Sequence, residues 1–340
     1  MESFEYNVNP GRVVFGAGSI NKLPEEIKRL NLSKPLLLST PQQRNQVVQL
    51  EPILERGGIQ KAGLFSNATM HTPTYVTNEA LTYAKDCGAD CLVSFGGGST
   101  TGLGKAISIR TGLPHISIPT TYAGSEMTPI LGETADGKKT TRSDPKILPG
   151  IVIYDVDFTM TLPPALSATS GVNAIAHAVE ALYARNTNPV MNLLALEGTK
   201  SLAESLPIIV NDSQNREARI KAQYGAWLCA MCLGSVGMNT YDCVAARHSI
   251  QRSKDPDVLR RLADVLPESD GDAINGLNVL LTKLKVKRGL KDFGMKEEDV
   301  DKAAEIAVSN PYWNPRGVEK EPLRETIRRC WAGEEARADL

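Results

Sequence analysis

Residues 91–105 read CLVSFGGGSTTGLGK, a sequence typical of a strand, a turn and the start of a helix. A short apolar run, typical of a buried strand, leads into three glycines and then into a segment that can form a helix. Glycine lets the backbone turn sharply and approach a ligand closely, and the first N–H groups of a helix can bind an anion. The stretch predicts a pyrophosphate cradle at Gly96, Gly97, Gly98 and Ser99, with a purely structural turn as the alternative.

Two common phosphate-binding loops are excluded by residue spacing. The dinucleotide fingerprint G-x-G-x-x-G, counted from Gly96, requires a third glycine where Thr101 stands. The P-loop requires a glycine at the position of Ser99 and a serine or threonine at the position of Ala106. The predicted cradle is therefore of another kind.

Strand-like and helix-like segments alternate through the first half of the chain. The strand-like segments are 12–15, 34–38, 61–66, 91–95, 115–118 and 151–154, and helical spacing is found at 23–30, 47–57 and 75–87. Such alternation predicts an α/β domain whose parallel sheet is covered on both faces. Ser39, the glycine-rich turn and Thr120–Tyr122 each follow a strand end, where ligands bind in such sheets, so we expect them to share one crevice.

The pattern changes after Leu162-Pro163-Pro164, where strand-like segments stop and helical periodicity takes over. Helices are predicted within 165–233 and at 256–266, 271–285 and 297–308. We therefore expect two domains, an α/β domain at 1–160 and an all-α domain at 161–340.

Composition and cysteine usage argue against several classes of protein, among them nucleic-acid-binding, membrane-bound and secreted proteins. A formal net charge of −1 and a predicted pI of about 6.5 argue against nucleic acid or an anionic membrane as partner. The N-terminus lacks the pattern of a signal peptide, and no apolar stretch is long enough to cross a membrane. Cys229 and Cys232 have redox-motif spacing, but their apolar helical context favours two core thiols. Together these features favour the cytoplasm.

Several long motifs carry a family resemblance. They are GGGSTTGLGKAISIRTGLP, IPTTYAGSEMTPILGET, KKTTRSDPKILPGIVIYDVD, TSGVNAIAHAVEALYA, YGAWLCAMCLGSVGM and NPYWNPR. In these motifs the chain resembles the maleylacetate reductases of the iron-containing alcohol dehydrogenase superfamily. The resemblance implies a dehydroquinate synthase-like architecture with a cleft between the domains. It also implies reduction of maleylacetate to 3-oxoadipate with NADH or NADPH, late in aromatic-ring degradation, by a homodimer.

The same resemblance implies roles for residues of the crevice. It makes Gly96 to Ser99 the pyrophosphate contacts and places Ser39 near the adenosine ribose. It puts Thr120, Thr121 and Tyr122 along the phosphates and the nicotinamide, and Ser125 is a further candidate for cofactor binding. Because no carboxylate follows Ser39 where it would repel a 2′-phosphate, and Arg44 stands nearby, the choice between NADH and NADPH stays open.

The chain departs from the superfamily at its metal site. Most members hold a divalent metal with an Asp and three His, and here the Asp position is Asn173, four residues before His177. The resemblance implies a reductase without a tightly held metal, whose catalytic residues are His177, Tyr122 and Asn173. His177 lies in an apolar context, so a hydrogen-bonded core histidine is the alternative interpretation.

A second departure follows Gly237-Met238, where the family's histidine-rich segment is absent. The chain has four histidines, at 71, 115, 177 and 248. A site rebuilt from Asp242, Cys243 and His248 with His177 matches no familiar ligand spacing, so we expect no metal. Two alternatives remain: a redox-inactive family member that uses the cleft for a non-redox reaction or for binding, and a gene model that omits an exon.

The expected chemistry survives without a metal. Hydride addition to a conjugated keto acid places negative charge on a carbonyl oxygen, which a preorganised hydrogen-bond donor can stabilise. Alcohol oxidation depends more on a metal that lowers the proton affinity of the alcohol. The sequence therefore favours conjugated keto acids as substrates, with Tyr122, Ser125, Lys138 and Lys139 as further polar candidates. The two lysines and Arg142 can equally form a solvated loop.

Overall fold

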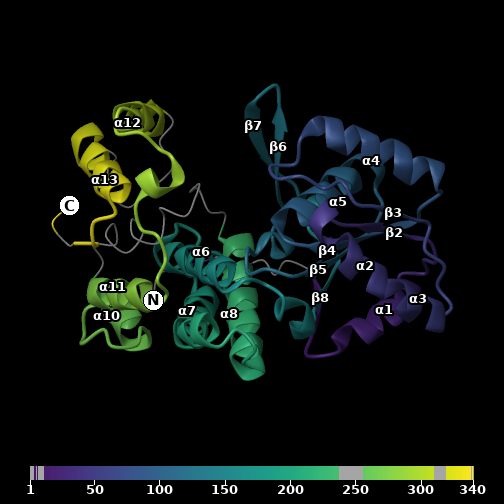
Figure 1. Ribbon diagram of the computed structural model, residues 1–340, viewed down its shortest axis with the longest axis horizontal. Helices are drawn as coiled ribbons and strands as arrows, with labels where there is room; N and C mark the ends of the chain where they lie inside the picture. Colours follow the sequence, from purple (N-terminus) through teal and green to yellow (C-terminus); the bar gives the residue numbers. More distant parts are fainter. Residues whose placement is uncertain are drawn as a thin grey trace. The chain divides into compact units, whose positions relative to one another are not determined.

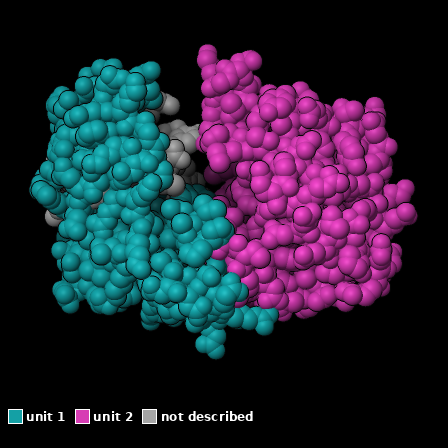
Figure 2. Space-filling model, viewed as in Figure 1, with its two compact units in different colours: residues 1–6, 163–340 teal, residues 7–162 magenta. Residues whose placement is uncertain are grey.

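The computed structural model describes residues 4, 6, 11–236, 256–309, 319–337 and 339 of the 340-residue chain. The chain divides into two compact units, one of residues 7–162 and one of residues 1–6 with 163–340. Figure 2 shows the two units in different colours. The first is an α/β unit and the second is helical, which confirms the predicted fold class.

A six-stranded sheet of order β1-β8-β5-β4-β2-β3 forms the centre of the α/β unit, and all of its strand pairs are parallel. Its strands are β1 (Arg12–Phe15), β2 (Pro35–Leu38), β3 (Gly63–Phe65), β4 (Cys91–Gly96), β5 (His115–Pro119) and β8 (Ile151–Tyr154). Every predicted strand is present. The strands β2, β4, β5 and β8 are buried along their whole length, as expected for a sheet covered on both faces.

Helices cover both faces of this sheet (Figure 1). Side chains of Leu37, Val93 and Ile118 pack with α1 (Leu23–Arg29), α2 (Arg44–Val47) and α3 (Glu51–Arg56) on one face. Alternate strand residues, Leu36 and Leu92 among them, pack with α4 (Thr74–Asp86) and α5 (Gly98–Thr111) on the other. The alternation follows from the period of two along a strand.

An antiparallel hairpin of β6 (Ile130–Ala135) and β7 (Lys138–Ser143) also belongs to the α/β unit. All of β7 is exposed. Lys138, Lys139 and Arg142 therefore do lie on a solvated surface, but in a strand and not in a loop. Arg142 reaches across the hairpin to Glu133, with Nη2 3.3 Å from Oε2.

The second unit consists of helices (Figure 1). They are α6 (Pro164–Tyr183), α7 (Pro189–Asn211), α8 (Arg216–Ser235), α10 (Pro256–Val265), α11 (Ala273–Lys283), α12 (Asp299–Ser309) and α13 (Lys320–Ala332). Asn188, Asn215 and Asp272 cap three of them by accepting backbone N–H groups of the first turn. In α8, Cys229 and Cys232 are buried free thiols whose pKa values are raised by burial, which supports the core interpretation.

The helices α6, α7 and α8 pack closely through glycines. A Cβ added to Gly225 of α8 would lie 2.9 Å from the backbone oxygen of Gly198 in α7. A Cβ added to Gly198 would lie 2.8 Å from the sulfur of Cys229. The two backbones approach so closely that neither position has space for a side chain.

We expect a Gly225→Ala variant to unfold more easily than the wild type. Alanine favours the helix by up to about 1 kcal/mol. The new methyl group would clash with the backbone of α7, which cannot move without disturbing the helix, and overpacking costs about 1–3 kcal/mol. Urea denaturation should therefore show a net loss. Gly98→Ala is the control, because a Cβ there meets nothing within 4 Å; equal stability of Gly225→Ala and wild type would contradict this packing.

No helix among the described residues is both long and apolar enough to cross a membrane.

Candidate functional site

The glycine-rich turn joins β4 to α5 in the predicted way. Gly96 has φ +150°, a conformation that residues with a side chain rarely adopt, and a Cβ there would lie 2.5 Å from Oγ1 of Thr100. Gly97 is the extended N-cap of α5, and its carbonyl accepts the N–H groups of Thr100 and Thr101, both at 3.1 Å. No side chain caps the helix. Its first N–H groups therefore remain free to bind an anion.

Open space lies in front of this helix start. Gly98 is exposed, and a Cβ built on it meets no atom within 4 Å. Two hydroxyls next to the turn, Ser39 Oγ and Thr100 Oγ1, are buried without a hydrogen-bond partner in the described part of the chain. Buried polar atoms are normally paired, so these two hydroxyls are available to a polar partner, either water or a ligand.

Gln43 links the strand ends that the sequence predicted to converge. Its Nε2 donates to Oγ1 of Thr120 at 2.8 Å, and its Oε1 accepts from Oγ1 of Thr40 at 3.4 Å. The N–H of Thr120 donates to the carbonyl of Gly96 at 3.1 Å. The ends of β2, β4 and β5 are thus tied together, as predicted. The sequence analysis missed Gln43, because its partner lies far along the chain.

Of the other predicted cofactor residues, Ser39 and Thr121 lie at the same carboxyl ends of the strands. Ser39 directly follows β2, whose Leu38 pairs with Ser94 of β4. A Cβ added to Gly97 would lie 3.0 Å from Cγ2 of Thr121, so this threonine borders the turn. Tyr122 is fully buried, and Ser125 begins a short 3-10 turn that ends at Met127.

The sequence analysis also missed two buried charged or titratable side chains of the α/β unit. Lys105, in α5, is fully buried, and its Nζ donates to the carbonyl of Ser125 at 2.5 Å. His115, predicted only as the start of a strand, is buried as well, with Nε2 2.7 Å from Oγ of Ser94. The only local sign that Lys105 is buried was its position within a run of small and apolar residues.

In the helical unit, Asn173 and His177 lie one turn apart on α6. Asn173 Nδ2 is 3.1 Å from His177 Nε2. With the amide in this orientation Nε2 accepts, so the imidazole proton lies on Nδ1. Nδ1 is buried without a hydrogen-bond partner among the described residues. His177 therefore offers a donor that the described structure does not use.

The buried His115 and the half-buried His177 both stay neutral in the folded protein. Burial lowers the pKa of His177 to about 4. The pKa of His115 falls to about 3, first through burial and then through the nearby charge of Lys105. An imidazolium at either position is unfavourable at neutral pH.

We therefore expect the free energy of unfolding to fall as pH drops from 7 to 5. An unfolded histidine titrates near pH 6.5, so below that pH the unfolded state takes up protons that the folded state does not. Each histidine should cost about 2 kcal/mol at pH 5. Urea titrations at both pH values test this, and a His177→Gln variant should show a shallower dependence. Equal stability at pH 7 and pH 5 would contradict neutral buried histidines.

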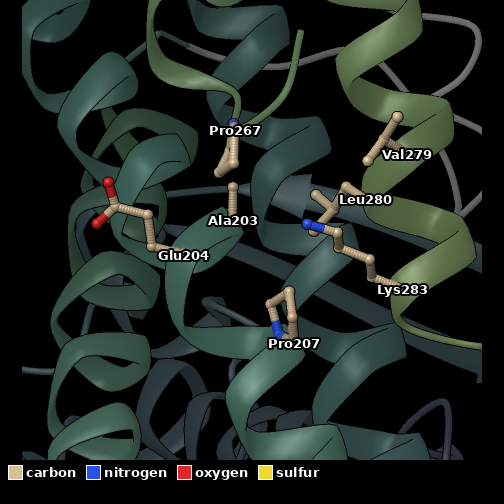
Figure 3. A pocket seen from close by; sticks show the side chains of 7 residues that line it. All are labelled: Ala203, Glu204, Pro207, Pro267, Val279, Leu280 and Lys283. Atoms are coloured by element: carbon tan, nitrogen blue, oxygen red, sulfur yellow. The ribbon is translucent and has the colours of Figure 1, made fainter.

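A small surface pocket of about 230 Å³ lies elsewhere in the helical unit (Figure 3). It is lined by Ala203, Glu204, Pro207, Pro267, Val279, Leu280 and Lys283. None of the predicted site residues lines it. Lys283 pairs with Glu268, and Glu204 pairs with Lys221, so its charged groups already have partners.

The described residues contain no group of three or more His, Cys, Asp or Glu side chains that could hold a metal ion. Asn173 and His177 bond to each other instead. Asp242, Cys243 and His248, the alternative ligands considered from the sequence, lie outside the described residues.

Comparison with known proteins identifies the family. The model of the iron-containing alcohol dehydrogenase family matches residues 10–156, and that of the C-terminal region of the Fe-containing alcohol dehydrogenase family matches 167–251 and 242–331. The chain belongs to the iron-containing alcohol dehydrogenase family. This family consists of oxidoreductases, and the predicted family resemblance is confirmed.

Within the family, the chain is similar to maleylacetate reductases. It is 45% identical to the maleylacetate reductase of Rhizobium sp. (strain MTP-10005), covering 98% of this chain and 99% of that protein. It is 39% identical to maleylacetate reductase 1 of Rhodococcus opacus, covering 97% of each. The crystal structure of maleylacetate reductase from Agrobacterium tumefaciens matches with a TM-score of 0.90 at 43% identity, covering 98% of this chain and 100% of that one.

These alignments also bear on the missing histidine segment. The alignment with the Rhizobium protein spans 355 positions, more than the 340 residues of this chain, so part of the relative faces gaps. The C-terminal family model matches in two stretches that overlap at 242–251. The match to the C-terminal model is therefore split close to the point, after Met238, where the sequence lacks the histidines.

Proposed function

We propose that this protein is a maleylacetate reductase that uses NADH or NADPH to reduce maleylacetate or a closely related unsaturated keto acid. The observation that carries the proposal is the uncapped start of α5 with open space at Gly98, in a chain that aligns end to end with maleylacetate reductases. No observation favours the redox-inactive alternative.

The turn and its neighbours fit a dinucleotide. The free N–H groups of Gly98 and Ser99 suit the pyrophosphate, and the unpaired hydroxyls of Ser39 and Thr100 suit the polar groups beside it. We assign the cofactor contacts to Ser39, Gly96, Gly97, Gly98, Ser99, Thr120, Thr121, Tyr122 and Ser125. NAD(P)H supplies the hydride when bound.

The residues of this chain then have to bind the keto acid and stabilise the oxygen on which negative charge develops. We assign the hydrogen-bond donor to Nδ1–H of His177, with Tyr122 as a second hydroxyl donor. Asn173 holds the proton on Nδ1 by donating to Nε2. A neutral imidazole fits this role, because the lowered pKa of His177 keeps it a stable donor across the neutral range.

We expect no stoichiometric metal in the purified protein. The neutral amide of Asn173 replaces the family's charged ligand, and the histidine-rich segment is missing. Elemental analysis after mild purification should find well under one zinc or iron per chain. A full equivalent of metal that a chelator removes together with activity would overturn this expectation.

The direct test is oxidation of NADH and NADPH by the purified protein with maleylacetate, beside a panel of primary alcohols with NAD⁺ and NADP⁺. The proposal expects rapid consumption of reduced cofactor with maleylacetate and slow turnover of the alcohols. A folded protein that binds the cofactor but reduces no unsaturated keto acid would favour the redox-inactive alternative.

We further propose a homodimer that acts in the cytoplasm, with nucleotide binding in residues 1–160 and the imidazole hydrogen-bond donor, His177, in residues 161–340. Light scattering of the purified protein tests the homodimer. Cofactor binding by a separately expressed N-terminal domain, if it folds, tests the functional division.

A further inference from the structure

Lys105 is a buried ammonium group that the proposed chemistry does not use. It lies in α5, two turns after the predicted cradle, and its side chain is fully buried. Its Nζ donates to the carbonyl of Ser125 at 2.5 Å, to Oγ1 of Thr128 at 2.9 Å and to the carbonyl of Ile130 at 2.8 Å. Ser125 Oγ is a fourth, longer contact at 3.4 Å, and the three shorter bonds account for all three N–H bonds of the ammonium group.

The three acceptors belong to one segment, residues 125–130, which runs from the loop after β5 into β6. A second buried contact fixes the same segment, since the hydroxyl of Tyr154 in β8 donates to Oε1 of Glu126 at 2.8 Å. Burying a cation is costly unless it is hydrogen-bonded and partly compensated by charge. The segment supplies both, through its acceptors and through Glu126.

The order of the strands gives this arrangement a consequence for the cofactor. β4 lies between β2 and β5. With the adenosine at Ser39 beyond β2 and the pyrophosphate at the turn after β4, the nicotinamide half extends over the end of β5. Residues 125–130, which Lys105 contacts, follow the end of β5 in the chain and so lie on the nicotinamide side. Helix α5, which carries Lys105, begins at the pyrophosphate.

We propose that Lys105 is a positioning residue that fastens the nicotinamide-side segment 125–130 to the helix that binds the pyrophosphate. This inference rests on the proposed function. Lys105 thereby fixes the distance between the start of α5, which binds the pyrophosphate, and segment 125–130, which lies beside the nicotinamide half. Lys105 itself touches neither half.

The groups facing Lys105 determine its charge. Burial lowers the pKa of Lys105 to about 7, and the nearby Glu126 opposes that shift. Burial likewise raises the pKa of Glu126, and His115 on β5 is neutral because burial lowers its pKa to about 3. Arg110, farther along α5, pairs with Glu133 instead, with Nη2 2.8 Å from Oε1.

The first test compares NADH with ADP-ribose, which lacks the nicotinamide, by calorimetry on wild type and Lys105→Met. Losing charge-assisted bonds worth about 1.5–3 kcal/mol should weaken NADH binding by about 10–100-fold. ADP-ribose binding should change by less than about threefold, because α5 and the turn remain. Arg110→Met, the matched control on the same helix, should leave both affinities unchanged. Equal effects of Lys105→Met on both ligands, or no effect on either, would refute the positioning role.

The second test measures how NADH affinity depends on pH. A lysine with a merely structural role would not change this dependence. In wild type the affinity should fall as pH rises above 7 and Lys105 loses its proton. Glu126→Gln removes the opposing charge, so the fall should occur at lower pH; this variant also carries the test if Lys105→Met does not fold. Identical profiles in wild type and Glu126→Gln would refute the inference. A wild type that binds neither NADH nor ADP-ribose would instead overturn the nucleotide function, and this inference with it.

Discussion

A Gly98→Asp variant should fold as well as the wild type and lose its affinity for NADH and NADPH. An added Cβ at Gly98 meets no atom within 4 Å, so the protein has space for the side chain. A carboxylate in the first turn of a helix also interacts favourably with the helix dipole. The same carboxylate would stand where the pyrophosphate binds, and like charges brought together in an interface cost several kcal/mol.

The expected loss of affinity is at least about 100-fold. Calorimetry with NADH and NADPH measures it, and a thermal melt of the variant checks the fold. Gly98→Ala is the matched control: it adds the steric bulk without the charge, so it should bind more weakly than wild type but far better than Gly98→Asp. Wild-type affinity in Gly98→Asp would show that the pyrophosphate does not bind at α5.

In a His177→Ala variant, kcat for maleylacetate reduction should be about 10²–10³-fold lower than in the wild type. This is the usual cost of removing one hydrogen-bond donor to an oxyanion. NADH affinity should stay unchanged, because His177 is assigned as the hydrogen-bond donor to the substrate oxygen and not as part of the cofactor cradle. We expect kcat to fall because Asn173 fixes the tautomer of His177 in which Nδ1–H is an unused donor.

Steady-state kinetics with saturating NADH measures the effect on His177→Ala. His71→Asn is the control, because His71 is exposed in a turn with φ +65° that asparagine tolerates. Tyr122→Phe distinguishes the two assigned donors. Undiminished kcat in the His177→Ala, Tyr122→Phe double variant would refute the assignment of the donors, as would rapid oxidation of primary alcohols by the wild type.

The parts of the fold that the sequence predicts are those encoded locally. Apolar runs of strand length, followed by glycine or hydroxyl residues, place Ser39, the glycine-rich turn and Thr120 at strand ends. Parallel pairing then brings those ends to one edge of the sheet. The strand β7 was missed because KKTTRS is exposed along its whole length, so it carries no apolar alternation.

Contacts between distant residues were not predictable in the same way. Gln43 looks like an ordinary turn residue until Thr120 lies beside it. Lys105 and Glu126 are both charged residues that composition alone would place on the surface. Only the folded structure shows that each is buried where the other offsets part of the cost.

The pairing of β1 with β8 has a consequence for biosynthesis. β1 is an edge strand whose partner in the sheet is β8, and Asp155 directly after β8 accepts the backbone N–H groups of Gly18 and Ile20. The ribosome must therefore add about 140 residues before β1 can pair, roughly 7–30 s at ordinary elongation rates. During that interval the segment of β1 has no partner strand, and unpaired segments of this kind are what nascent-chain chaperones shield from aggregation.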